Sequence, residues 1–179
     1  YLILLSLTRN SHSNIEVIFV LDRCTDSTKK EILNEIKGDS RFTILENNYC
    51  PKDWAGKCHA AKMGSSKSSG SFLLFMDADT ESNPELVSSA LNAIVFYKVG
   101  LLSLLSTLKY SDKFEKKLQP IASAMLMRMY PIDRINSSNP RPFANGQFLL
   151  FSRESYEGIG GHDAVQEDLL EDLAFARVI

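Results

Sequence analysis

The sequence predicts an α/β fold in which helices flank a mostly parallel sheet. Three observations carry this prediction: short apolar runs of strand length, segments with helical spacing between those runs, and polar turn residues at the junctions. The chain has 179 residues and 44% of them are hydrophobic, which is enough to bury the core of one domain. We therefore expect residues 1–179 to form a single domain.

Apolar runs rich in β-branched and aromatic residues mark the predicted strands. These strands are residues 15–22, 42–47, 71–77 and 99–110, and a further strand opens the segment 143–161. Helical segments separate most of them, so consecutive strands should run parallel. Ligands of such sheets bind outside the carboxyl ends of the strands, which is where functional residues are expected.

Helical spacing falls between the predicted strands. The predicted helices are residues 29–39, 58–70, 83–98 and the end of 162–179. Pro84 follows the capping residue Asn83 at the start of one helix, and Gly38 ends another. A further helical stripe, interrupted near its start by Pro120, repeats at steps of three and four: Phe114, Leu118, Ile121, Met125 and Met129.

The composition argues against several classes of protein. The formal net charge is -2 and no basic stripe is present, so we expect no binding to nucleic acid. Three cysteines without a CxxC pair favour a reducing compartment over a disulfide scaffold, and we expect a cytoplasmic protein. No apolar stretch has the length of a transmembrane helix.

The stretch LLFMDADT ends a predicted strand with two aspartates, Asp77 and Asp79, on either side of Ala78. Alternate residues of a strand point to the same face, so the two carboxylates can converge on one hard cation. Mg²⁺ and Mn²⁺ prefer oxygen ligands, and Mg²⁺ often binds one or two carboxylates together with substrate phosphates. The alternative is a polar strand end that caps the next turn.

Two more candidates for ligand binding lie upstream. Asp22 ends the strand at 15–22, where a carboxylate could accept hydrogen bonds from a nucleobase or ribose. Lys57 follows Gly56 at a predicted helix start, where a phosphate could bind. A turn aspartate and a surface lysine beside a packed tryptophan are the alternatives.

Acidic residues gather near the end of the chain. Glu171 and Asp172 follow Glu167 and Asp168 in the segment EDLLED. One interpretation is an acidic helical face. The other is that Asp172 or Glu171 acts as a general base.

Five segments occur in an order that resembles family 2 glycosyltransferases of the GT-A type, a Rossmann-like fold. The segments are EVIFVLDRCTDST, DWAGKCHAA, LLFMDADT, NGQFLLFSRESYEGIGGHDAV and LEDLAFAR. The resemblance covers nearly the whole chain. It is closest to the membrane-associated branch that includes carotenoid and hopanoid-associated enzymes.

The resemblance implies a role for each matching residue. Asp22 would contact the base of a nucleotide-sugar donor, for which we expect a UDP-sugar, and Lys57 would line the donor loop. Asp77 and Asp79, with Ala78 between them, would bind the donor through Mg²⁺ or Mn²⁺. Asp172, with Glu171 before it, would be the base of an inverting transfer. The acceptor-side turn would comprise Gly160, Gly161 and His162, with a structural role as the alternative for the histidine.

This sequence also departs from the family pattern. Leu21 replaces the first of two aspartates after the second strand, which puts base recognition in doubt. The family's first strand, which precedes a helix resembling residues 1–10, is missing. So is the region that follows the last motif, and we therefore expect a catalytic domain truncated at both ends.

The expected reaction is transfer of a sugar to a hydroxyl or carboxyl group, of a lipid by preference. The stripe at 114–129, with lysines nearby, could lie on the inner face of a membrane or pack on the core, and the two interpretations weigh equally. Two rival functions stay open: a sugar-nucleotide nucleotidyltransferase, and a binding module without catalysis.

Overall fold

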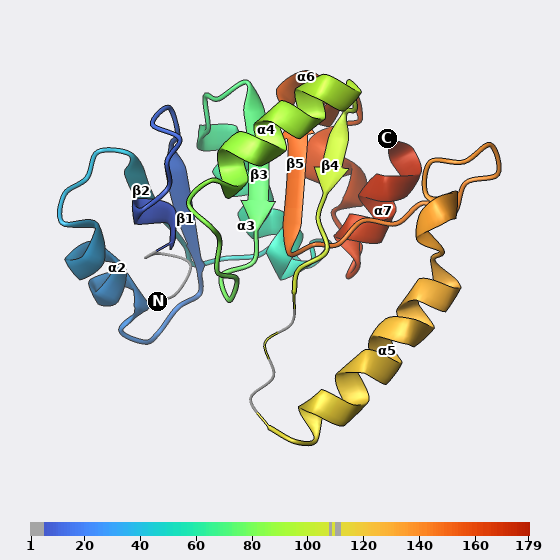
Figure 1. Ribbon diagram of the computed structural model, residues 1–179. Helices are drawn as coiled ribbons and strands as arrows, with labels where there is room; N and C mark the ends of the chain where they lie inside the picture. Colours follow the sequence, from blue (N-terminus) through green and yellow to red (C-terminus); the bar gives the residue numbers. More distant parts are fainter. Residues whose placement is uncertain (1–5, 108, 110–111) are drawn as a thin grey trace.

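The computed structural model describes residues 6–107, 109 and 112–179. Its strands form two groups, with helices on the faces of both (Figure 1). In chain order the elements are β1 (Val17–Asp22), α2 (Thr28–Ile36), β2 (Phe42–Asn47), α3 (Gly56–Lys67), β3 (Phe72–Met76), α4 (Leu86–Tyr97), β4 (Leu101–Ser103), α5 (Glu115–Met129), the 3-10 helix η1 (Ile132–Arg134), β5 (Phe148–Ser152), α6 (Arg153–Gly158), the 3-10 helix η2 (Gly161–Val165) and α7 (Glu171–Val178). The predicted α/β class is confirmed.

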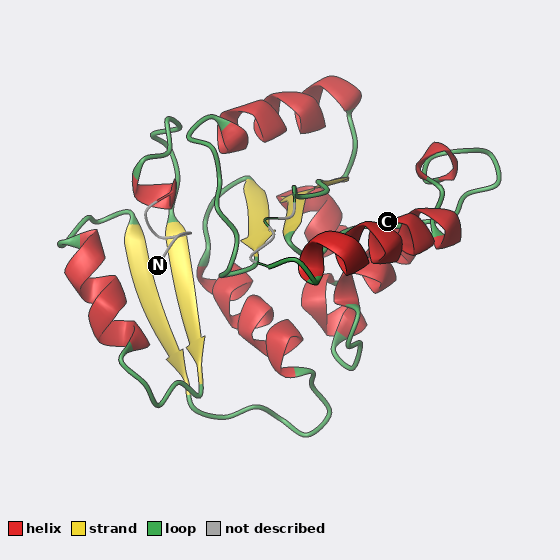
Figure 2. Ribbon diagram, turned by 60° about the horizontal axis from the view of Figure 1, so that its bottom comes forward, coloured by secondary structure: helices red, strands yellow, loops and turns green. Residues whose placement is uncertain are grey.

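The first group is a parallel pair, β1 and β2, whose register runs from Val17 opposite Phe42 to Asp22 opposite Asn47. The helix between them, α2, completes a βαβ unit, and Figure 2 shows the two strands side by side with α2 alongside. A small core joins these elements: Leu7, Leu21, Ile32, Ile36 and Phe42. The helix ends with Lys37 and then Gly38 in the left-handed region, which confirms the predicted stop.

The second group is a three-stranded sheet in the order β3-β5-β4, with β5 antiparallel to both neighbours. Strand β5 is the central strand of this sheet, and its side chains from Phe148 to Phe151 are all buried. Phe148 and Leu150 pack toward α4, while Leu149 and Phe151 pack with Tyr156 and Phe175 on the opposite face. The alternation of strands and helices along the sequence did not indicate that β5 would lie antiparallel between β3 and β4.

Two predicted elements differ in extent from those observed. The strand expected over 99–110 is observed only as Leu101–Ser103, which pairs with residues 149–151 of β5; residues 108 and 110 lie outside the described part. Of the expected helix over residues 1–10, the structure describes a helical turn at 6–8, and 1–5 are outside the described part.

Helix α5 differs from the other helices because none of its residues is buried. It extends away from both sheets in Figure 1. The expected interruption at Pro120 is not observed: the helix continues through it, with Asp112 capping its start by accepting hydrogen bonds from the backbone N–H groups of Phe114 and Glu115. Among the described residues, no helix combines the length and hydropathy that crossing a membrane requires.

Candidate functional site

The two aspartates of the motif lie in a turn. Strand β3 ends at Met76, and the backbone N–H and side-chain hydroxyl of Thr80 both donate to the carbonyl oxygen of Asp77. Strand alternation therefore does not place these carboxylates, and our reason for their convergence was wrong. Asp77 is half-buried and points toward α3, whereas Ala78 and Asp79 are exposed.

Lys57 joins three elements at one point. Its Nζ lies 2.9 Å from Oδ1 of Asp77, after β3, and 2.7 Å from Oε1 of Glu171, at the start of α7. Burial lowers the pKa of Lys57, but hydrogen bonds to Glu171 and Asp77 outweigh it and leave the pKa above its ordinary value. The lysine is therefore a charged link between two carboxylates that are far apart in sequence.

The two acidic residues at the start of α7 have different environments. The side chain of Glu171 is only 6% exposed and is engaged by Lys57. Asp172 is half-buried, and its carboxylate accepts hydrogen bonds from the backbone N–H groups of Gly146 and Leu173, each at 2.8 Å. Asp172 is thus oriented by backbone N–H groups, and no described residue forms an ion pair with it, which makes it the better candidate base of the pair.

Gly146 belongs to the site, although the sequence did not single it out. A Cβ at this position would lie 3.2 Å from both Oδ2 of Asp172 and Nζ of Lys57. A side chain here would require both groups to move by a few tenths of an ångström, so glycine suits the close approach of the loop before β5. In the sequence, the NGQ turn before the strand was the feature that could have indicated a role for Gly146.

Asp22 lies at the carboxyl end of β1 within a polar network. Arg23 forms an ion pair with its carboxylate at 2.6 Å, and Asn47, itself 5% exposed, donates to it at 2.7 Å. These hydrogen bonds hold the pKa of Asp22 below its usual range. A Cβ at Gly56 would meet the Arg23 guanidinium at 2.8 Å, so this network adjoins the start of α3 and the Lys57 cluster.

Arg23 and Asn47 were missed at the level of sequence. Each lies at the end of a predicted strand, and Arg23 adopts a positive φ of 52° that brings its side chain back over Asp22. Asn47 is also within 3.1 Å of the His59 ring, and this couples the end of β2 to α3. Only the parallel pairing of β1 and β2 brings Asn47 beside Asp22.

The turn at Gly160 and Gly161 is defined by backbone geometry. Both residues have positive φ, and a Cβ on Gly161 would come within 2.7 Å of the Tyr156 ring. His162 is 2% exposed, hydrogen bonds to the Tyr156 hydroxyl at 2.7 Å, and packs edge-on against Phe75 and Phe175. This placement favours the structural alternative for His162 over contact with an acceptor.

The pH dependence of stability tests that structural role. Burial of the imidazole, with the positive charges of Lys57 and Lys62, lowers the pKa of His162 to about 4. When pH falls below the ordinary value of about 6.5, the unfolded chain takes up this proton first, so stability is lost as pH falls from about 6.5 to about 4. We expect the wild type to lose about 1.4 kcal/mol per pH unit more than His162→Gln over this window, measured by urea unfolding.

A matched control for this measurement is His12→Gln, because His12 is only partly buried. It should keep the wild-type pH slope. Equal slopes for the wild type and His162→Gln would mean that the buried imidazole does not control acid stability.

The donor atoms of the turn after β3 fit a divalent cation only in part. Asp77 and Asp79 supply carboxylate oxygens, the ligands that Mg²⁺ and Mn²⁺ prefer. Within the described part of the chain, no group of three or more His, Cys, Asp or Glu side chains could hold a metal. The residues therefore suit a cation that takes its other ligands from a bound diphosphate and water.

The cluster defines a class of site: acidic side chains after two strands, a lysine at a helix start and an oriented aspartate, all at one edge of an α/β fold. Such edges bind nucleotide-type ligands in open α/β sheets. A family model described as glycosyl transferase family 2 matches residues 3–160, and the chain belongs to this family.

The comparison with curated proteins found no match. Among solved structures, the chain is similar to the mannosyltransferase PcManGT from Pyrobaculum calidifontis in complex with GDP-Man and Mn²⁺, with a TM-score of 0.62 and 18% sequence identity. The alignment covers 88% of this chain and 41% of that chain, so this chain spans less than half of its structural neighbour. The predicted GT-A-type fold is thereby confirmed.

Proposed function

We propose that this protein transfers a sugar from a nucleotide-diphosphate-sugar to an acceptor hydroxyl or carboxyl. The observation that carries the proposal is the bridge from Lys57 to Asp77 and Glu171, which joins the end of β3 and the starts of α3 and α7 into one site. Family membership supports sugar transfer, and the structural neighbour was solved with a nucleotide-sugar.

The donor would bind along the carboxyl ends of β1 and β3. Lys57, at the amino end of α3, faces the position where the diphosphate would lie, and the helix dipole favours negative charge there. Asp77 and Asp79 would hold Mg²⁺ or Mn²⁺, which supplies Lewis-acid neutralisation of the leaving diphosphate. Asp22, oriented by Arg23 and Asn47, would hydrogen bond to the base or ribose.

The acceptor would be activated by Asp172. Two backbone N–H groups orient its carboxylate, which would take the proton from an acceptor hydroxyl as the oxygen attacks the anomeric carbon. Attack opposite the departing diphosphate inverts the anomeric configuration, and no covalent intermediate with the protein is needed. A hexosyl group is the sugar we expect.

The decisive assay incubates the full-length protein with radiolabelled UDP- and GDP-sugars, Mn²⁺ and a membrane lipid extract. Label in the lipid fraction supports sugar transfer to a lipid, and the preferred donor identifies the base. Release of pyrophosphate would indicate a nucleotidyltransferase. Binding of the nucleotide-sugar without turnover would indicate a binding module, and either of these two results would contradict the proposal.

Metal dependence gives a second, sharper prediction. EDTA should abolish transfer and Mn²⁺ should restore it, because the two aspartates cannot neutralise a leaving diphosphate by themselves. Asp79→Ala should lower the rate at least about 100-fold, as expected when Lewis-acid stabilisation is lost. Glu81→Ala, which removes an acidic residue of the same segment paired with Lys109, is the matched control and should retain activity. Full activity of Asp79→Ala would argue against the metal site.

Helix α5 supports the membrane part of the proposal. No residue of the helix is buried. Phe114, just before the helix, and four apolar side chains of the helix are 45% to 68% exposed: Leu118, Ile121, Met125 and Met129. Lys113, Lys116, Lys117 and Arg128 lie in the same segment. An exposed apolar face with basic neighbours suits the surface of an anionic membrane. The alternative was packing on the core, and no residue of α5 is buried.

Vesicle flotation tests this contact. The protein should float with vesicles of phosphatidylglycerol and phosphatidylcholine, and Ile121→Asp/Met125→Asp should reduce the bound fraction at least about tenfold, because each substitution removes apolar burial and adds negative charge. Val95→Asp/Phe96→Asp, at two exposed positions of α4, controls for the two added charges. Equal flotation of the α5 variant and the wild type would contradict membrane contact through α5.

A further inference from the structure

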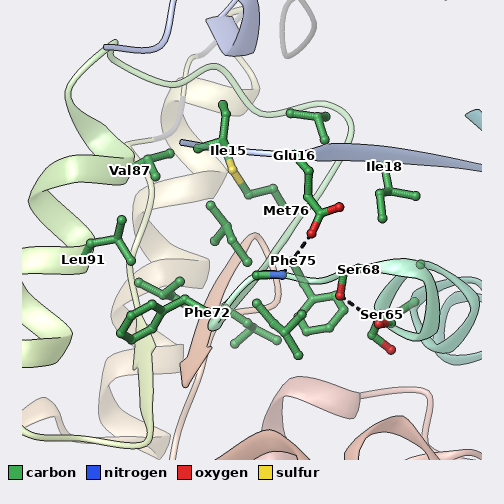
Figure 3. A pocket seen from close by; sticks show the side chains of 18 of the residues that line it. Ile15, Glu16, Ile18, Ser65, Ser68, Phe72, Phe75, Met76, Val87 and Leu91 are labelled. Carbon is green, nitrogen blue, oxygen red and sulfur yellow. Dashed lines mark hydrogen bonds between the residues drawn. The ribbon is translucent and has the colours of Figure 1, made fainter. Parts of the chain in front are cut away.

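A large cavity and a small one in the described part of the molecule differ in chemistry. The large cavity, of about 1440 Å³, lies between β1 and β3 and has a largely apolar lining, with Ile15, Phe72 and Leu91 around it in Figure 3. The small cavity, of about 350 Å³, lies where the end of α5, the loop before β5 and the end of α7 meet. Two arginines are among the residues that line this second cavity, hereafter the arginine pocket: Met129, Tyr130, Pro140, Arg141, Pro142 and Arg177.

The two arginines of this pocket keep their positive charges uncompensated. Both are exposed, and the arginines that form ion pairs with carboxylates in the described part of the chain are others: Arg23, Arg41 and Arg153. Within the described residues, no acidic side chain lines the pocket. The pocket is therefore a local site of positive charge on a chain whose formal net charge is -2, and it suits an anion.

The backbone and side chain of Arg141 are held in place before any ligand binds. Pro140 and Pro142 flank it, and a proline fixes its own φ and restricts the residue before it. The backbone N–H of Arg141 donates to the carbonyl of Arg134 at 3.0 Å, and its Nη1 donates to the carbonyl of Met129 at 2.8 Å. A guanidinium has several further N–H donors, whose planar arrangement matches the oxygens of a phosphate.

The exposed apolar stripe of α5 leads directly to the arginine pocket. Met129, the last residue of α5, is 59% exposed and belongs both to the stripe and to the pocket lining. The ring of Tyr130, the next residue, packs against Phe143 at 5.2 Å, which fixes this side of the pocket. Figure 1 shows the end of α5 close to α7. An apolar surface that ends at two arginines matches a molecule with an apolar body and an anionic head.

We propose that the arginine pocket binds the phosphate of an anionic phospholipid headgroup, while the acyl chains stay in the membrane that contacts α5. This inference rests on the membrane contact proposed for α5 and adds a defined headgroup site to it. Basic pockets at the membrane boundary bind anionic headgroups in other proteins. The volume of the pocket lies within the range of about 300 to 1,000 Å³ that is usual for sites of small ligands.

The arginine pocket is separate from the cluster around Lys57. The two share no residue, although Arg177 and Asp172 both belong to α7. At about 100° per residue, side chains five positions apart on a helix project roughly 140° from each other. The lipid in the pocket is thus an anchor at one side of α7, and the acceptor meets Asp172 at another side.

Titration of the full-length protein with dihexanoyl phosphatidylglycerol, below its micelle concentration, tests the headgroup site by calorimetry. Arg141→Gln/Arg177→Gln should lower the affinity at least about tenfold, because charge-assisted hydrogen bonds to the phosphate are lost. Lys116→Gln/Lys117→Gln is the matched control: it removes two charges at exposed positions outside the pocket and should keep the wild-type affinity.

Three results of this titration would overturn the proposal. One is a wild type that does not bind the short-chain lipid, and another is an arginine variant that binds it as tightly as the wild type does. The third is binding of inorganic phosphate as tight as that of the lipid, because the pocket would then be a site for free phosphate.

Vesicle flotation gives a second readout. With vesicles of phosphatidylglycerol and phosphatidylcholine, the arginine variant should lose at least about threefold more of the bound fraction than the lysine variant, although each loses two charges. Equal losses would mean that only diffuse attraction acts, and would overturn the proposal. Ile121→Asp/Met125→Asp should keep its affinity for the short-chain lipid, so the headgroup site and the contact through α5 can fail separately. Neither readout depends on sugar transfer.

Discussion

Replacing Asp172 with asparagine should lower the transfer rate of the full-length protein about 10²- to 10⁴-fold while the nucleotide-sugar still binds. The amide keeps the shape of the carboxylate, and its oxygen can still accept a hydrogen bond from Gly146. It cannot take a proton from the acceptor. Single-turnover rates with saturating donor, together with calorimetric donor affinity, separate the loss of base catalysis from a loss of binding.

Asp168→Asn is the matched control for this experiment. Asp168 lies four residues earlier and has an exposed side chain, while its backbone carbonyl, which accepts from the Cys58 thiol, is unchanged by the substitution. The control should retain the wild-type rate. A carboxylic acid acceptor would need little help from a base, so Asp172→Asn should slow transfer to a hydroxyl much more than transfer to a carboxyl. Full activity toward a hydroxyl acceptor would remove Asp172 from the mechanism.

Lys57→Met is the second substitution with a large expected effect. It removes the cation that lies between Asp77 and Glu171 and leaves Glu171, whose side chain is 6% exposed, without its partner. We expect the free energy of unfolding to fall by about 1–3 kcal/mol, the cost of an unsatisfied buried polar group. Donor affinity should fall about 10- to 100-fold, because a charged contact with the diphosphate is lost.

A second substitution distinguishes the two effects. Adding Glu171→Gln to Lys57→Met removes the unpaired buried charge, so stability should recover while donor affinity stays low. Lys62→Met is the control, since Lys62 pairs with Asp163 at the surface, where ion pairs contribute little. If the double variant regained donor affinity, Lys57 would act only on the fold. Urea unfolding and calorimetry with the nucleotide-sugar measure the two quantities.

Local chemistry explains why most elements could be predicted. Strands β1, β2 and β3 lie within one or two residues of the expected ranges, because each is a short apolar run that ends at polar turn residues. The end of α2 at Lys37 and Gly38 follows from the left-handed conformation that glycine adopts easily. The candidate residues Asp22, Lys57, Asp77, Glu171 and Asp172 were found for a related reason: each lies at the end of a strand or the start of a helix.

Long-range contacts account for what could not be predicted. Strand β5 separates β3 from β4, and its antiparallel direction depends on pairing across more than seventy residues. Gly146 and Asn47 carry no chemistry that marks them in the sequence; they matter because the loop before β5 approaches Asp172 and because β2 aligns with β1. The place of His162 in the sequence made it a candidate for acceptor binding. In the structure it is buried and hydrogen bonded to Tyr156.

The sequence by itself determined the α/β class, the order of the elements and the acidic strand ends, since those depend on residue types and spacing over a few residues. The tertiary structure alone decided that the motif aspartates lie in a turn, that Lys57 neutralises Asp77 and Glu171 together, and that a cavity with a largely apolar lining lies between β1 and β3. These features arise where segments distant in the chain come within a few ångströms, and no local pattern encodes that distance.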